Sequence, residues 1–253
     1  SQGEGFSYNP GVLTPGSTAP LWTFILATVG LFRDDFMVPA LALSVCFLLV
    51  SLWLAYGFTL WITRTVWAAL LAGLGVALSG RLLWAGLAGM ETTAFAALSL
   101  AAIWAYSKWG LRWFVVLLFG LAGQLRPEGH ALFVLALADA GWVWWRDSRF
   151  SSEGWLRSLA QHFLLPVILY GVIAAPYSLF SLATTGRPLP NTFYAKVGSQ
   201  HLFSLRTLQE TVAWHWQDNP ISLILVLFGL VPLWRRSRLS VLCLLGLPVF
   251  TAV

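Results

Sequence analysis

Long apolar runs constrain the fold of this chain more than any other feature. A membrane-spanning helix needs roughly 20 mainly apolar residues, with a practical range of about 17–25. Runs of this kind recur at 37–60, 65–80, 90–107, 112–125, 129–145, 161–183, 219–234 and 239–253. Several are short, which tilting or snorkelling flanks can accommodate. The pattern predicts an all-α fold, a polytopic transmembrane helix bundle of about eight spans.

The composition excludes a soluble domain. Hydrophobic residues make up 58% of the chain and charged residues 10%, whereas a soluble domain carries about a quarter charged residues. Segment 20–32 is apolar but too short to cross, and Arg33, Asp34 and Asp35 follow it directly. We interpret it as an interfacial or re-entrant helix. Cys46 and Cys243 lie inside apolar runs, and we interpret them as small buried hydrophobes.

The basic residues predict which side of the membrane each loop faces. If the N-terminus lies outside, nine of the fifteen Lys and Arg residues fall in inner loops. These nine are Arg64, Lys108, Arg112, Arg146, Arg149, Arg157, Arg235, Arg236 and Arg238. Inner loops carry an excess of basic residues, so we expect the N-terminus on the non-cytoplasmic side.

The organisation predicts one transmembrane domain over 1–253 that is truncated at both ends. An outer loop and the interfacial helix occupy 1–36, and the helix bundle occupies 37–183. A long outer loop follows at 184–218, and the last spans lie at 219–253. The chain starts in a polar loop and stops at Val253 within an apolar run, so we expect a fragment of a longer membrane protein.

Four polar segments fall on the predicted outer side. The first, 3–22, is rich in Gly, Pro, Asn and Ser and predicts a loop with tight turns. Within it, Tyr8 and Asn9 either line a polar pocket or belong to a plain surface loop. The second segment carries Glu91 at the start of an apolar helix. There the carboxylate either serves the helix dipole, with Thr92 and Thr93 as caps, or faces an enclosed aqueous cavity.

The third segment, LRPEGH, places Arg126 and Glu128 between two apolar runs with almost no loop between them. The two residues either form an ion pair that shapes the hairpin, or Arg126 offers its planar fork to a phosphate. We interpret His130 as an interfacial residue rather than a proton carrier. Asp139, inside an apolar run, either pairs with a neighbour or marks a deep polar site.

The fourth segment, 186–198, combines fixed backbone with varied side-chain chemistry. Asn191, Tyr194 and Lys196 offer a hydrogen-bonding amide, an aromatic face and a cation within six residues. Aromatic faces and amides suit sugars, and a cation suits a phosphate. The structural alternative is an interfacial loop with a snorkelling Lys.

The order YNPG, STAPLW, GMET, LRPEG and LPNTFYAK resembles the GT-C superfamily of membrane glycosyltransferases. The nearest likeness is to the mycobacterial terminal arabinofuranosyltransferase family, whose members act in cell-wall biogenesis. The resemblance covers nearly the whole chain. It implies a polyprenyl-phosphate-linked sugar donor, a glycan or other envelope acceptor, and transfer on the non-cytoplasmic face of a bacterial plasma membrane.

The resemblance also implies roles for individual residues. The family's catalytic base is an Asp in an outer loop that normally precedes the YNPG stretch, so we expect it upstream of Ser1 and expect this fragment alone to be inactive. Asp34 and Asp35 follow the PLW helix instead, and the role is not transferred to them. We expect Arg126 and Lys196 to stabilise the departing phosphate. Members of the superfamily differ in their need for a divalent cation.

The remaining candidates are then expected around the substrates. Glu91 and Glu128 either position the acceptor or hold the cations, while Asn191 and Tyr194 contact sugar or lipid phosphate. Tyr8 and Asn9 complete the set. A transporter or flippase for a lipid-linked sugar, or a non-catalytic membrane scaffold, are the alternatives. The enzyme hypothesis predicts that Glu91, Arg126, Glu128 and Lys196 converge.

Overall fold

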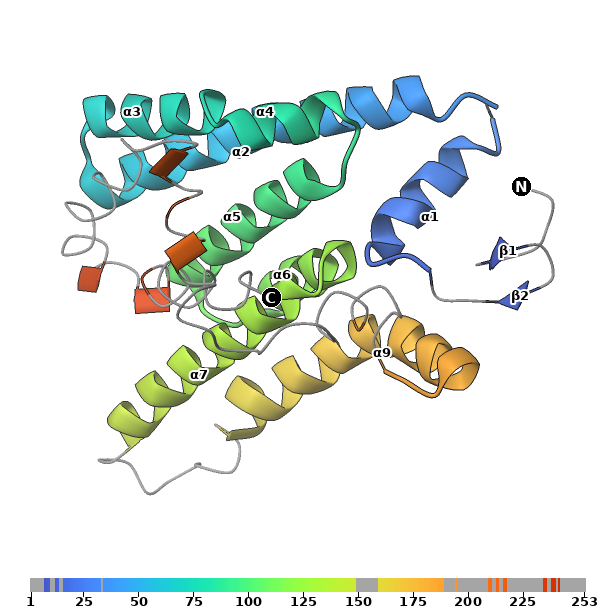
Figure 1. Cartoon of the computed structure of the whole chain (residues 1–253). Helices are drawn as coiled ribbons and strands as arrows, with labels where there is room; N and C mark the ends of the chain where they lie inside the picture. The colour runs from blue at the N-terminus through green and yellow to red at the C-terminus, as the bar shows by residue number, and fades with distance from the viewer. Residues whose placement is uncertain are drawn as a thin grey trace.

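A computed structural model describes the chain over residues 7–9, 12–13, 16–32, 34–148 and 159–188, and at single positions between 194 and 241. Its elements are β1 (Ser7–Asn9), β2 (Val12–Leu13), α1 (Pro20–Val29), α2 (Met37–Thr63), α3 (Val66–Ala77), α4 (Gly80–Leu87), α5 (Thr92–Trp109), α6 (Trp113–Leu125), α7 (Glu128–Ser148), η1 (a π-helical turn, Ala160–Leu164) and α9 (Leu165–Thr185). The described part is helical apart from an antiparallel hairpin of β1 and β2 (Figure 1). The predicted all-α class is therefore confirmed.

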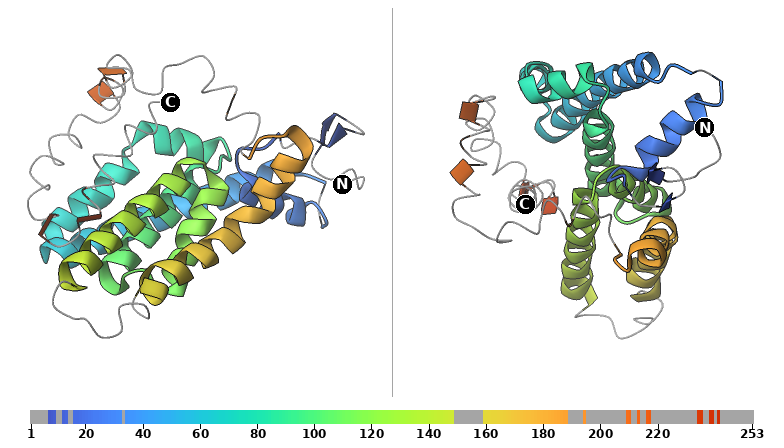
Figure 2. Two further views of the ribbon diagram at one scale, coloured as in Figure 1. Left: turned by 90° about the horizontal axis from the view of Figure 1, so that it is seen from below. Right: turned by 45° about the vertical axis from the view of Figure 1, so that its right-hand side comes forward.

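Helix α6 lies at the centre of the arrangement. It packs against α1, α5, α7 and α9, while α2 packs against α3, α4 and α5. Figure 2 shows α2 and α3 on one side and α7 and α9 on the other, with α5 and α6 between them. Val115, Val116 and Phe119 of α6 are fully buried, as is Leu132 of α7. These side chains form the main core of the bundle.

Among the described residues, two helical segments are long and apolar enough to cross a membrane: α2 and the continuous segment Ala160–Thr185. The number rises to three if α3 and α4, which meet at 53°, form one broken span. Leu49 and Trp53 on α2 and Val172 on α9 are more than half exposed, as expected for side chains that face lipid. The structure is thus compatible with an integral membrane protein. By these criteria two or three described helices are candidate spans, so the predicted bundle of about eight spans is not confirmed.

Several predicted runs and residues differ in the structure or lie outside the described residues. The run 65–80 forms helix α3 only as far as Ala77. The separate helix α4 was not predicted, and the Ser79 Oγ caps it by accepting from the Leu82 N–H at 3.5 Å. Cys46 is exposed on α2 rather than buried. The runs 219–234 and 239–253 lie almost entirely outside the described residues. Segment 20–32 does form a helix, α1, and its interfacial position stays a prediction.

The two ends of α7 define two ends of the bundle. At the Arg126 end, α6 turns into α7 and α5 begins. At the Arg146 end, Tyr106 near the end of α5 lies beside Asp139, Val143 and Arg146 in the second half of α7. Both ends carry charged side chains, and their chemistry differs.

Candidate functional site

Arg126 occupies the short turn between α6 and α7. Because Pro127 follows it, helical backbone is disfavoured at this position, and Arg126 is extended with φ −150°. Helix α7 then starts at once, with the Gly129 N–H donating to the Arg126 carbonyl at 2.9 Å. The turn is tight because Gly129 packs directly on α6, where a Cβ would lie 2.5 Å from the Gly123 nitrogen. The sequence therefore fixes the Arg126 side chain at the end of the bundle.

Glu91 precedes α5 and is positioned by α2. The hydroxyl of Ser44 on α2 donates to the Met90 carbonyl at 2.9 Å. The neighbouring Gly89 has φ +69°, and a Cβ there would lie 3.2 Å from the Cβ of Ala40. Only glycine adopts this backbone readily. The turn that carries Glu91 is thus held against α2 by a hydrogen bond and a close approach.

Glu91, Thr92, Arg126 and Glu128 meet in what we call the Arg126 cluster. Arg126 Nη2 donates to Glu128 Oε1 at 3.1 Å, and Nε donates to Oε2 at 3.5 Å. Arg126 Nη1 donates to the Thr92 hydroxyl at 3.3 Å and lies 3.6 Å from Glu91 Oε1. One guanidinium therefore ties the α6–α7 turn to the start of α5. The predicted convergence is confirmed for Glu91, Arg126 and Glu128.

The predicted capping of α5 by Thr92 and Thr93 is wrong. Glu91 takes the N-cap position without a side-chain capping bond. The Thr93 hydroxyl is buried and has no hydrogen-bond partner among the described residues. Thr92 accepts from Arg126 instead. A charged donor makes a stronger hydrogen bond than a neutral backbone N–H, so the tertiary contact prevails over the local cap.

The charge balance of the cluster bears on its chemistry. Two carboxylates flank one guanidinium, which leaves a formal charge of −1 at neutral pH. The side chains of Arg126, Glu91 and Glu128 keep 29%, 19% and 20% of their exposure, so a ligand can reach them. Within the described part of the chain, Glu91 joins the cluster through the longer ion pair alone, and its carboxylate keeps lone pairs for a ligand hydroxyl. The arrangement favours a hydroxyl-rich ligand over a free phosphate, and the expected role of Arg126 toward the departing phosphate stays a prediction.

A second polar pair links α7 to α9. His130 Nδ1 and Tyr170 Oη lie 2.5 Å apart, 40 residues distant in sequence. The Tyr170 ring stacks on Phe133 with 3.8 Å between centroids. Gly123 leaves the room for this pair, because a Cβ there would lie 2.9 Å from both polar atoms. The interpretation of His130 as an interfacial residue did not predict its hydrogen bond to Tyr170. In the sequence, Gly123 indicates only that a neighbouring side chain approaches α6 closely.

The start of α1 and the residues just before it pack against the Arg126 end. Trp22 is buried and packs in one cluster with Ala94 of α5 and Leu125 of α6. Tyr177 of α9 donates its hydroxyl to the Ser17 carbonyl at 2.6 Å. The STAPLW, GMET and LRPEG segments, separate in sequence, thus lie at one end of the bundle.

Tyr8 and Asn9 lie in one local structure near the N-terminus, and Asp35 lies in another. The backbone of Tyr8 and Asn9 forms strand β1, where a plain loop with tight turns is predicted. Their side chains lie outside what the structure describes, so their substrate contacts stay predictions. Asp35 Oδ1 accepts from the Met37 N–H at 2.9 Å. Asp35 therefore helps to start α2, which gives it a structural role separate from the Arg126 cluster.

The fourth polar segment is described only in part. Asn191 and Lys196 lie outside the described residues, so the contact of Lys196 with the cluster stays a prediction. Tyr194 is half-buried, with the Arg187 guanidinium carbon 4.9 Å from its ring centroid. A cation over an aromatic face is favourable by about 0.5–2 kcal/mol. Arg187 itself follows Gly186, which ends α9 at φ +72°.

Comparison with family models, curated proteins and solved structures finds no match to this chain. Among the described residues, no group of three or more His, Cys, Asp or Glu side chains is placed to hold a metal ion. The candidate site therefore rests on the chemistry and geometry of the Arg126 end.

Proposed function

We propose that this protein transfers a sugar from a polyprenyl-phosphate-linked donor to a cell-envelope acceptor, such as a glycan, lipid or protein. One observation carries the proposal. The GMET and LRPEG segments, which underlie the resemblance to GT-C glycosyltransferases, meet through the contact between Arg126 and Glu91 at 3.6 Å. The STAPLW segment packs against the same two helices through Trp22. The segments that carry the resemblance thus meet at one end of the bundle, which supports a substrate site there.

The proposed reaction determines which roles the residues of the site must have. The acceptor oxygen bonds to the anomeric carbon while the bond from that carbon to the phosphate oxygen breaks. The acceptor proton passes to a general base, and polyprenyl phosphate leaves. Glu91 then accepts a hydrogen bond from a sugar hydroxyl, and Glu128 fixes the Arg126 guanidinium at the site. We assign the general base to none of the described residues.

Membrane placement is part of the proposal. The helices cross a bacterial plasma membrane as a GT-C-like bundle of about eight spans, and the Arg126 end faces the non-cytoplasmic side. Support comes from the excess of basic residues at the opposite end, including Arg64, Lys108, Arg112 and Arg146. In this orientation the cluster lies where a lipid-linked donor presents its sugar.

Sugar transfer in membranes that carry the full-length protein tests the proposal. Glu91→Gln removes one charge and the longer ion pair, and it leaves the 3.1 Å pair of Arg126 with Glu128 in place. We expect transfer to fall roughly 10- to 100-fold, because a positioned hydrogen-bonding group is lost. Arg126→Ala should lower it further. Arg112→Ala, an exposed site at the other end of α6, is the matched control. Parental transfer rates in both Glu91→Gln and Arg126→Ala would exclude the cluster from the site.

A lipid-linked sugar transporter is the second candidate, and Asp139 is the observation that favours it. This buried carboxylate lies near the middle of α7 and lines a pocket at the Arg146 end. Polar sites near the middle of the spans are typical of transporters. Proteoliposomes with a fluorescent lipid-linked sugar separate the candidates. Translocation without a new glycosidic bond indicates a transporter, transfer indicates the enzyme, and a membrane scaffold gives neither.

A further inference from the structure

A pocket opens at the Arg146 end, far from the Arg126 cluster. Asp139, Val143 and Arg146 lie on one face of α7 at helical spacing and line this pocket with Tyr106 at the end of α5. Its volume is about 210 Å³, well above the roughly 10–15 Å³ that a single water needs. Asp139 is eleven residues beyond Glu128, which places it roughly 16 Å along α7 at a rise of 1.5 Å per residue.

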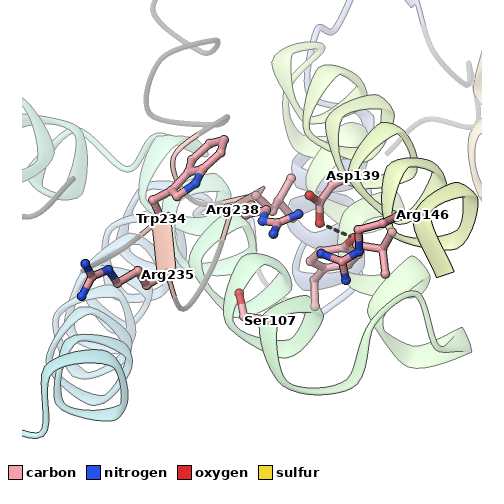
Figure 3. A pocket seen from close by; sticks show the side chains of 9 residues that line it. Ser107, Asp139, Arg146, Trp234, Arg235 and Arg238 are labelled. Atoms are coloured by element: carbon pink, nitrogen blue, oxygen red, sulfur yellow. Dashed lines mark hydrogen bonds between the residues drawn. The ribbon is translucent and has the colours of Figure 1, made fainter. Parts of the chain in front are cut away.

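The base of the pocket is built from buried groups. The Tyr106 hydroxyl donates to Asp139 Oδ2 at 2.7 Å, and both side chains are 9% exposed. Leu239 is fully buried in the main core and lies next to Arg238 in sequence. The packing of Leu239 thus holds Arg238 at the pocket. In Figure 3, Arg238 and Arg146 point toward Asp139, whereas Arg235 extends away from it.

The charge of this pocket is opposite to that of the Arg126 cluster. The lining includes Arg146, Arg235 and Arg238 against the single carboxylate of Asp139, so it is net positive. Arg238 is only partly exposed and faces Asp139, and no ion pair is found for it in the described part of the chain. Its planar fork is available to an added anion.

We propose that this pocket binds a phosphate group. A phosphate monoester carries close to two negative charges near neutral pH, so a net positive lining attracts it. Guanidinium groups bind phosphate through paired, charge-assisted hydrogen bonds. Basic pockets between membrane helices also bind the head groups of anionic lipids. The phosphate is carried either by a lipid in the membrane or by a soluble molecule, and the recognition chemistry is shared.

The test measures phosphate affinity in the full chain. Titration calorimetry with inorganic phosphate in detergent examines a soluble source. Native mass spectrometry from nanodiscs of phosphatidylcholine with or without phosphatidic acid examines a lipid source. Arg238→Gln should weaken binding roughly 10-fold, the effect of losing about one charge-assisted hydrogen bond. Arg112→Gln, exposed at the same end and outside the pocket, should leave binding unchanged.

Asp139→Asn supplies a readout with the opposite sign. The amide keeps an oxygen to accept from Tyr106 and removes the negative charge from the pocket, so phosphate should bind several-fold tighter. A purely structural role for Asp139 would not strengthen binding. Selective effects with inorganic phosphate assign a soluble ligand, and selective effects with phosphatidic acid assign a lipid head group.

Three results would overturn the proposal. They are no binding of either probe by the parent chain, equal losses in Arg238→Gln and Arg112→Gln, or no tightening in Asp139→Asn. Size-exclusion profiles confirm that each variant is folded before affinity is compared. Sugar transfer is not measured here, so the outcome is independent of the proposed enzymatic function.

Discussion

Removal of the guanidinium from the Arg126 cluster should destabilise the fold by about 2 kcal/mol. Arg126→Met keeps much of the apolar stem and leaves Glu91 and Glu128 facing each other without a cation. At 3.1 Å and an effective dielectric of 20, the gross attraction to Glu128 is about 5 kcal/mol. Desolvation and side-chain ordering offset much of it. With exposures of 19–29%, the net value lies between about 0.2–1 kcal/mol for exposed pairs and about 3–5 kcal/mol for broken buried pairs.

A charge-cancelling variant separates electrostatics from packing. Glu91→Gln and Glu128→Gln, added to Arg126→Met, remove the two uncompensated carboxylates and should restore about half of the lost stability. Unfolding in mixed micelles with increasing SDS, followed by tryptophan fluorescence, gives the free energies. A thermal scan should show a fall in Tm of roughly 4–8 °C for the single variant. Arg112→Met, at an exposed site, serves as the control.

The result that would refute this reasoning is specific. A single variant within about 0.5 kcal/mol of the parent would mean that the cluster does not hold the α6–α7 turn against α5. A triple variant less stable than the single one would mean that Glu91 and Glu128 make stabilising contacts independent of Arg126.

Two further predictions concern packing within the bundle. Gly129→Ala should destabilise the fold by about 3 kcal/mol in the same assay, because the added Cβ would lie 2.5 Å from the backbone of α6. Gly171→Ala, with open space around it, is the control and should be nearly neutral. Similar values for the two variants would contradict the close approach of α6 and α7. Tyr106→Phe removes the hydrogen bond to Asp139 and should cost about 2 kcal/mol. A Tyr106→Phe variant as stable as the parent would show that Asp139 does not depend on this donor.

Apolar runs predicted most helices well because length and hydropathy are local properties. The run 37–60 became α2 (Met37–Thr63), and 161–183 became the segment Ala160–Thr185. The run 65–80 overran the end of α3 at Ala77, and the apolar pattern did not predict the separate helix α4, which Ser79 caps. A rule that weighs capping signals with hydropathy would place the break between the two helices.

The contacts of the site were predictable where the two contacting residues are close together in the sequence. Arg126 and Glu128 are two residues apart and flank a proline turn, so their pairing follows from local geometry. The joining of Glu91 to Arg126 was expected from the resemblance, and its geometry depends on how α5 packs on α6. The pairs His130–Tyr170 and Tyr106–Asp139 join residues 40 and 33 apart. Such pairs require the tertiary fold, and a single sequence carries almost no signal for them.

Photocrosslinking of the donor tests the central claim most directly. A polyprenyl-phosphate sugar with a photoreactive group on the sugar is activated in membranes that contain the protein, and labelled peptides are identified by mass spectrometry. The proposed function predicts label at the Arg126 end, in the peptides that carry Glu91 and Arg126, and loss of that label with excess unmodified donor. Label confined to the Arg146 end, or equal label in a control lipid without the sugar, would contradict it.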